Sequence, residues 1–82
     1  MINITVIPVD GQPHYKTLNG SLKDYQTIID GYIEVVKVSS YEQLLVDEDA
    51  IMKNKNVNRI ASVLAKKRIL GTAILIKIED FK

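Results

Sequence analysis

Residues 21–38 read SLKDYQTIIDGYIEVVKV, and this stretch predicts a capped helix, a glycine stop and a strand. Ser21 is a good N-cap because its hydroxyl can accept a hydrogen bond from a free amide of the first turn. Apolar residues recur behind it at helical spacing, namely Leu22, Tyr25, Ile28 and Ile29. We expect the helix to stop at Asp30 or Gly31, with Gly31 left-handed, since glycine enters that conformation without a steric penalty.

The rest of the chain is arranged around this helix and strand. After Gly31, β-branched and aromatic residues dominate 32–38, and we expect this strand inside the sheet. Further strands are predicted at 2–9, 14–18, 41–46 and 72–78, the first two joined by the Asp10-Gly11 turn and 32–38 joined to 41–46 by Ser39-Ser40. Asn56 is the expected N-cap of a second helix, which ends in the basic cluster 66–68.

This order of elements, ββαββαβ, predicts an α+β fold. We expect one small domain over residues 1–82, with a mostly antiparallel sheet of about five strands and both helices on one face. A domain of this length has little stability to spare, and the chain has no cysteine to cross-link it although 46% of its residues are hydrophobic. Homo-oligomerisation is therefore expected as a source of further buried area.

Localisation follows from what the sequence lacks. There is no basic apolar leader at the N-terminus and no stretch of about 20 apolar residues, which predicts a cytoplasmic protein with no membrane span. The lack of cysteine agrees with a reducing compartment.

The net charge of +1 hides an uneven distribution. Residues 1–49 hold three basic and eight acidic residues, whereas 50–78 hold seven basic residues and no acidic one. Either the two halves intermix their charges in the fold, or the basic half forms a patch for an anionic partner. Nucleic acid is an improbable partner, because aromatic residues are few and the net charge is near neutral.

Catalytic chemistry has little support. The single histidine, His14, sits in a proline-flanked turn with no nucleophile motif around it. The acidic run 47–49 lacks the spacing that wraps carboxylates around one metal ion, so we expect a solvated turn leading into a short helical turn over 50–55. The four glycines are dispersed and form no phosphate-binding loop. The sequence predicts neither an enzyme nor a cofactor or metal site.

Binding has better candidates. Tyr32 and Glu34 are expected on the same sheet face. The Tyr32 ring can then stack on a base while the Glu34 carboxylate accepts hydrogen bonds from ribose or base. Alternatively, Glu34 lies at an exposed edge or pairs with a lysine. Asn58 and Arg59 lie at a helix N-terminus, which favours phosphate, although capping alone also explains them. The remaining candidates are Lys67 and Arg68, which also suit a solvated helix end.

Short motifs add a family resemblance. Gly31-Tyr32-Ile33-Glu34, then Val46-Asp47-Glu48, then Asn58 and Ala61, and then Gly71-Thr72-Ala73 resemble a family of small uncharacterised proteins carried by phages and other mobile elements. That setting implies a counter-defence role, acting in the host-cell cytoplasm. We expect a non-enzymatic sponge that sequesters a phosphate-bearing signalling nucleotide through Tyr32, Glu34, Asn58, Arg59, Lys67 and Arg68. The alternative is an interaction module that binds and inhibits a host protein.

Overall fold

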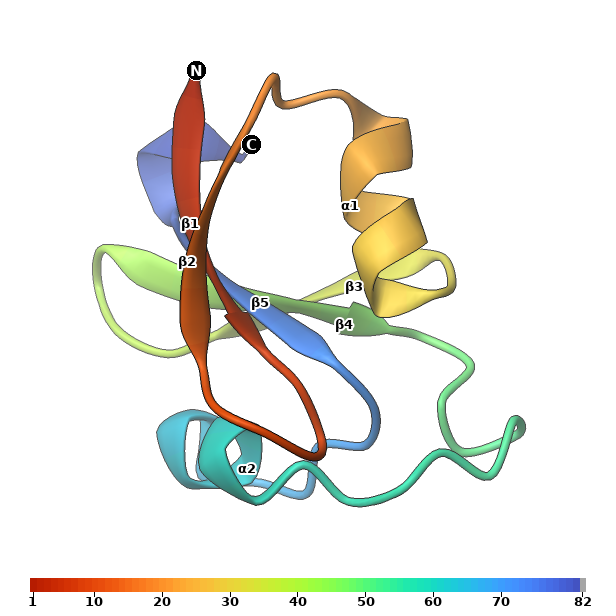
Figure 1. Ribbon diagram of the computed structural model, residues 1–82. Coiled ribbons are helices and arrows are strands. Elements are labelled where there is room, and N and C mark those ends of the chain that lie inside the picture. The colour runs from red at the N-terminus through yellow and green to blue at the C-terminus, as the bar shows by residue number, and fades with distance from the viewer. Residues whose placement is uncertain (82) are drawn as a thin grey trace.

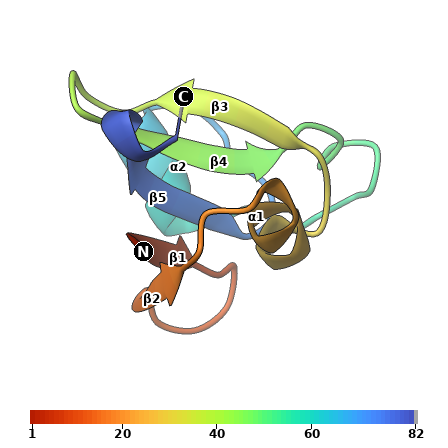
Figure 2. The same cartoon turned by 90° about the horizontal axis from the view of Figure 1, so that it is seen from above.

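The computed structural model describes residues 1–81 and contains a five-stranded antiparallel sheet with two α-helices (Figure 1). The elements are β1 (Ile2–Ile7), β2 (His14–Leu18), α1 (Leu22–Ile29), β3 (Ile33–Lys37), β4 (Glu42–Asp47), α2 (Arg59–Ala65), β5 (Ala73–Lys77) and a final 3-10 turn η1 (Ile78–Asp80). The strands lie in the order β2-β1-β5-β4-β3, which Figure 2 shows from above. The α+β class and the order ββαββαβ are confirmed.

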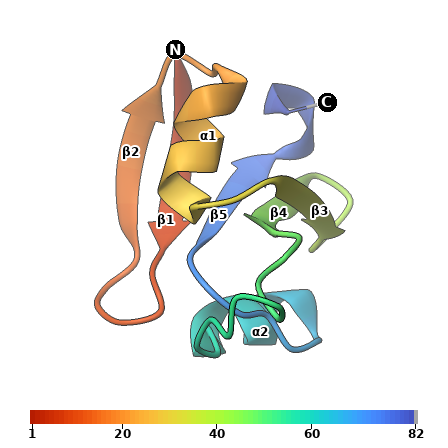
Figure 3. The ribbon, with the colours of Figure 1, turned by 90° about the vertical axis from the view of Figure 1, so that its right-hand side faces the viewer.

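The two helices do not share a face of the sheet, so that part of the prediction is wrong. Side chains alternate along β4: Leu45 packs in the cluster that includes Tyr25 and Ile29 of α1, whereas Leu44 packs in the cluster that includes Ala61 of α2. Figures 1 and 3 show α1 and α2 on opposite sides of the sheet. Apolar residues on both sides of β4 and β5 already require cover on both faces.

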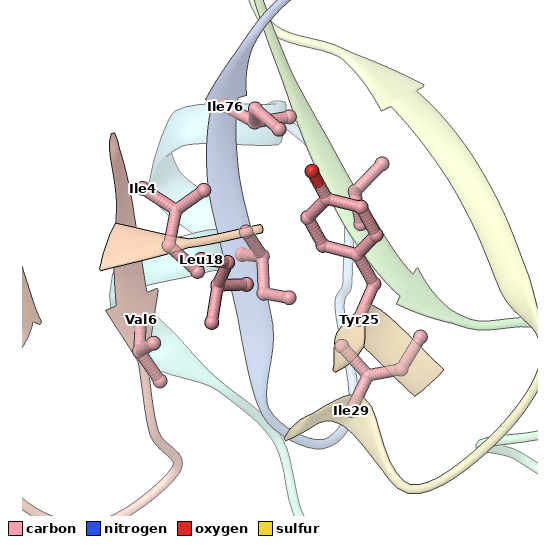
Figure 4. Packing of buried hydrophobic residues seen from close by; sticks show 8 residues of the cluster. Ile4, Val6, Leu18, Tyr25, Ile29 and Ile76 are labelled. Carbon is pink, nitrogen blue, oxygen red and sulfur yellow. The ribbon is translucent and has the colours of Figure 1, made fainter. Parts of the chain in front are cut away.

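The larger core lies under α1. Tyr25 and Ile29 project from the helix toward strand residues of the sheet, which are Ile4, Val6, Leu18, Leu45, Ile74 and Ile76 (Figure 4). The Tyr25 ring meets Phe81 edge to face, with ring centroids 5.2 Å apart. Each of the eight residues of this cluster is buried, and together they fix α1 across β1, β5 and β4.

β3 lies at an edge of the sheet and not inside it, which corrects the sequence prediction. Its one neighbour is β4, and of its five residues only Val36 is buried. Three of the five residues of β3 are apolar, as are three of the six residues of the inner strand β4. Composition therefore did not distinguish an edge strand from a central one.

The helix ends also differ in part from expectation. Ser21 caps α1 as predicted, with its hydroxyl accepting from the Asp24 amide at 3.3 Å. The left-handed residue that ends α1 is Asp30 (φ 56°), not Gly31. The cap of α2 is Asn58, not Asn56, and α2 stops at Ala65 with Lys66 left-handed, so residues 66–68 follow the helix.

Candidate functional site

A hollow with a volume of about 430 Å³ opens on the α2 side of the sheet, beside the edge strand β3. Its walls are the ends of β3 and β4, the turn after β4, and the segment that follows α2. Its apolar lining consists of Val36, Val46, Ala50, Ile51, Ile69 and Leu70. We call it the charged hollow because its other lining residues are Glu34, Asp47, Glu48, Asn54, Lys55, Lys67 and Arg68.

Among the residues that the structure describes, four of these charged side chains are unpaired. Within residues 1–81, neither Glu34 nor Glu48 forms an ion pair or a side-chain hydrogen bond, and neither does Lys67 nor Arg68. All four residues are exposed to solvent. Carboxylates and cations thus line one hollow more than 4.0 Å apart. A bound molecule that carries an anion and hydrogen-bond donors has complementary groups available at both walls.

The other two charged residues that line the hollow, Asp47 and Lys55, form an ion pair with each other, and Lys53 pairs with the same carboxylate. Asp47 is 3% exposed, and its Oδ2 atom lies 2.9 Å from Lys53 Nζ and 2.8 Å from Lys55 Nζ. Its Oδ1 atom accepts from the Asp49 amide at 2.9 Å. Both lysines also donate to the Asp30 carbonyl at the end of α1, each at 2.9 Å. We call Asp47, Lys53 and Lys55 the Asp47 cluster.

The environment of Asp47 favours its ionised form. Burial alone raises the pKa of this carboxyl, but the hydrogen bonds from Lys55, the Asp49 amide and Lys53 outweigh burial, so the net pKa is lowered. The hydrogen bond to Asp47 in turn raises the pKa of Lys53. Both directions mean that the pair is fully charged at neutral pH.

The Asp47 cluster corrects two predictions about the sequence. Asp47 does not lie in a solvated turn: it ends β4 and is buried. Residues 48–54 form a turn in which the Lys53 amide donates to the Asp49 carbonyl at 3.0 Å, so a single helical turn is present near the one expected over 50–55. Gly31 is required for a different reason from the one predicted. A Cβ atom at Gly31 would overlap the Asp47 carboxylate, so glycine is needed for close approach and not for a left-handed backbone.

The structure brings together three of the six predicted ligand-binding residues. Glu34, Lys67 and Arg68 all line the charged hollow. Glu34 is opposite Val46 in the β3–β4 register, which places it on the face that carries α2. Tyr32 lies just before β3 and is 65% exposed, but it does not line the hollow.

Asn58 and Arg59 lie elsewhere, beside a second and shallower hollow lined by Pro8, Val9, Ile60 and Val63. The Asn58 side chain is 1% exposed, and it donates to the carbonyls of Ile7 (2.7 Å) and Gly71 (2.9 Å) while accepting from the Ala61 amide (3.0 Å). These hydrogen bonds join the start of α2 to β1 and to the segment that precedes β5. The site proposed below leaves out Tyr32, Asn58 and Arg59.

Sequence reasoning missed Glu48 and the Asp47 cluster. The sequence feature that could have predicted the cluster is the acidic run 47–49 followed within a few residues by Lys53 and Lys55. A turn of that length allows both lysines to contact Asp47. The two halves therefore intermix their charges only in part. Lys53 and Lys55 pair with the acidic half, whereas Lys67 and Arg68 form no ion pair within residues 1–81.

The described residues hold no group of three or more His, Cys, Asp or Glu side chains placed to bind a metal ion. Among residues 1–81 there is also no helix with the length and apolar character needed to cross a membrane.

Comparison with known proteins gives a family without an assigned activity. No curated protein and no solved structure matches this chain. Residues 2–82 match a family described as a domain of unknown function, DUF3846. That match covers nearly the whole sequence and agrees with the predicted membership of an uncharacterised family. The chain belongs to the DUF3846 family.

Proposed function

We propose that this protein is a non-enzymatic binding domain that sequesters a small phosphate-bearing nucleotide in the charged hollow. The observation that supports this most directly is the set of four unpaired charges, two carboxylates and two cations, around an apolar floor. Surface charges of opposite sign usually gain a little by pairing with one another. Within residues 1–81 these four charges form no ion pair, so their groups are free to contact a ligand.

Each part of the hollow has a defined role in this proposal. Arg68 and Lys67 bind the phosphate, because a guanidinium offers a planar fork of donors and an ammonium offers a compact charge. Val36, Val46 and Leu70 contact the apolar faces of the base and sugar. A volume of about 430 Å³ lies in the range of small-ligand pockets.

Binding without turnover fits this arrangement. The unpaired side chains can hold and neutralise a ligand, but the hollow offers no histidine, cysteine or serine to attack it. A protein with these properties lowers the free concentration of its ligand in proportion to its own abundance. In a phage or other mobile element, the setting that the sequence motifs imply, the ligand is a signalling nucleotide of host defence.

A thermal-shift panel tests the proposal. Purified protein is heated with nucleoside monophosphates, cyclic dinucleotides or ADP-ribose, and a nucleotide that binds the native state raises Tm by mass action. Arg68→Ala should abolish most of the shift, because a charge-assisted hydrogen bond is worth about 1.5–3 kcal/mol, or roughly tenfold or more in affinity. Arg59→Ala is the matched control, since Arg59 is also exposed but lies beside the other hollow. The proposal fails if no nucleotide shifts Tm, or if the two variants behave alike.

One further observation favours a second function, binding of a protein partner by strand addition. The amide of Val38 donates to Glu42 and that of Glu48 donates to Tyr32, so the even-numbered positions of β3 bond to β4. The N–H and C=O groups of Ile33, Val35 and Lys37 therefore point away from the sheet, and Val35 is 47% exposed. An extended segment of another protein can pair with this edge.

Proline substitution separates the two functions. Val35→Pro removes an outward amide without removing a bond to β4, so it should block strand addition and leave nucleotide binding in place. Loss of a captured host protein with Val35→Pro, together with no nucleotide shift in the unmodified protein, would favour the partner-binding function. Val36→Pro is not a useful control, because its amide bonds to β4.

A further inference from the structure

We infer that the charged hollow selects guanine among the bases, with Glu34 reading the Watson–Crick edge. This inference rests on the proposed function, because it names the base of the nucleotide bound there. The hollow places cations on the segment after α2 and carboxylates on the β3–β4 wall. Because Arg68 and Glu34 line the same hollow from different elements, a nucleotide whose phosphate contacts Arg68 can place its base against Glu34.

A carboxylate restricts which base can be presented. An ionised glutamate only accepts hydrogen bonds, through two oxygens that lie side by side. Guanine presents two parallel donors on one edge, the N1–H and the 2-amino group, and both oxygens are satisfied at once. Adenine and cytosine each present one amino donor next to a ring nitrogen that only accepts, so the second carboxylate oxygen would face a lone pair. Uracil presents its single N–H between two carbonyl oxygens.

Of the two unpaired carboxylates, Glu34 is the better placed to discriminate. Its backbone is fixed within β3, where it is opposite Val46 in the sheet register, and Val36 beside it contributes to the apolar floor. Glu48 lies in the turn that follows β4, although its amide is anchored by a 3.0 Å hydrogen bond to the Tyr32 carbonyl. A side chain that recognises a base is held in a more defined orientation on a strand than on a turn.

The lysines next to the hollow do not cancel this selectivity. Lys55 lines the hollow, but its ammonium group is bound to Asp47 and to two backbone carbonyls, those of Ile29 and Asp30. Lys53 is likewise bound to Asp47. Within the described chain, Glu34 has no cation within ion-pairing distance, so its oxygens are free to accept from a base.

Titration calorimetry with three monophosphates tests the inference. GMP should bind about tenfold or more tightly than AMP, since one good bidentate pair discriminates by that factor. IMP lacks the 2-amino group but keeps the N1–H, so its affinity should fall between the two. The three ligands carry the same phosphate, which isolates the contribution of the base.

Glu34→Gln provides the matched variant. A glutamine presents one acceptor and one donor, the pattern that complements adenine, so the preference for GMP over AMP should collapse or reverse. Glu79→Gln is the control and should keep the preference, because Glu79 is an exposed glutamate that does not line the charged hollow. Glu48→Gln tests the second unpaired carboxylate of the hollow. All three positions are exposed, so none of the variants should unfold, which far-ultraviolet circular dichroism confirms before titration.

The outcomes separate the two levels of the proposal. Equal binding of GMP, IMP and AMP would overturn the inference about guanine and leave nucleotide binding standing. Loss of the preference in Glu48→Gln but not in Glu34→Gln would overturn the assignment to Glu34. If none of the three nor any other nucleotide binds the unmodified protein, the proposed function fails and the inference fails with it.

Discussion

The Asp47 cluster and the rim of the charged hollow are built from the same kinds of side chain and share a wall, yet their charges are used in opposite ways. In the cluster, one buried carboxylate is held by two lysines and a backbone amide. On the rim, Glu34, Glu48, Lys67 and Arg68 have no such partner in the described residues. Removing one partner of a buried ion pair destabilises a fold, whereas removing an exposed and unpaired charge changes its stability little.

The cluster also explains how the hollow keeps its shape. Lys53 and Lys55 tie the turn after β4 to the last carbonyls of α1 as well as to Asp47. Residues 48, 50, 51 and 54 of that turn line the hollow. The comparison therefore predicts that changes in the cluster alter stability first and binding second, whereas changes on the rim alter binding alone.

The largest expected effect is that of Asp47→Asn. The substitution keeps the shape of the side chain but removes the charge that both lysines contact, and breaking a buried ion pair from one side costs about 3 kcal/mol. Lys55 is mostly buried in this contact, with its side chain 16% exposed, so its charge is left poorly compensated. Urea denaturation should show a lower midpoint with an unchanged slope. A loss below about 0.5 kcal/mol would mean that the cluster contributes little.

Gly31→Ala should cost about 2 kcal/mol, as overpacking of a tight site does. The reason is specific: the new methyl group overlaps the Asp47 carboxylate. In an Asp47→Ala background that carboxylate is absent, so the further cost of Gly31→Ala should shrink markedly. A double-mutant cycle on urea midpoints measures this coupling.

Asp30→Gly is the control for the alternative explanation of Gly31. Asp30 holds the left-handed conformation at the end of α1, and glycine adopts it without strain, so this variant should be close to neutral. If Gly31→Ala is equally costly with and without the Asp47 carboxylate, a backbone requirement at Gly31 is the better explanation.

These residues show how far sequence reasoning extends. The helix signal after Ser21, the turn at Asp10-Gly11 and the hairpin at Ser39-Ser40 are local, and all of them appear in the structure. The contact between Gly31 and Asp47 joins the turn after α1 to the end of β4, and the position of β3 at the edge depends on strand order. Neither is encoded in periodicity. For the same reason Asn58, which caps α2 and bonds to β1, looked like a phosphate ligand.

Acid should remove the contribution of the cluster. The pKa of Asp47 is lowered from an ordinary value of 3.8, so its pairing stabilises the native state above that value and the stability is lost as the pH falls through the lower folded-state pKa. Comparing urea midpoints of the unmodified protein and Asp47→Asn from pH 7 to about pH 2 isolates this group. The difference between them should stay constant down to about pH 5 and close below pH 4. A constant difference at all pH values would contradict the assignment.

The smallest expected effect is that of Arg68→Gln on stability. Arg68 is exposed and makes no ion pair within residues 1–81, so removing its charge should change the free energy of unfolding by no more than about 0.5 kcal/mol. Lys67→Gln should behave in the same way. Lys66, Lys67 and Arg68 are consecutive like charges, so removing one of them also relieves repulsion among them.

The stability of Arg68→Gln bears most directly on the function. Charges of the Asp47 cluster should contribute to the free energy of unfolding, and charges on the rim of the hollow should not. If Arg68→Gln destabilises the protein as Asp47→Asn does, Arg68 makes a structural contact and is not free for a ligand. If it leaves urea midpoints unchanged but removes the nucleotide-dependent rise in Tm, its charge serves binding alone. Measuring both quantities on the same variant separates a structural arginine from a binding one.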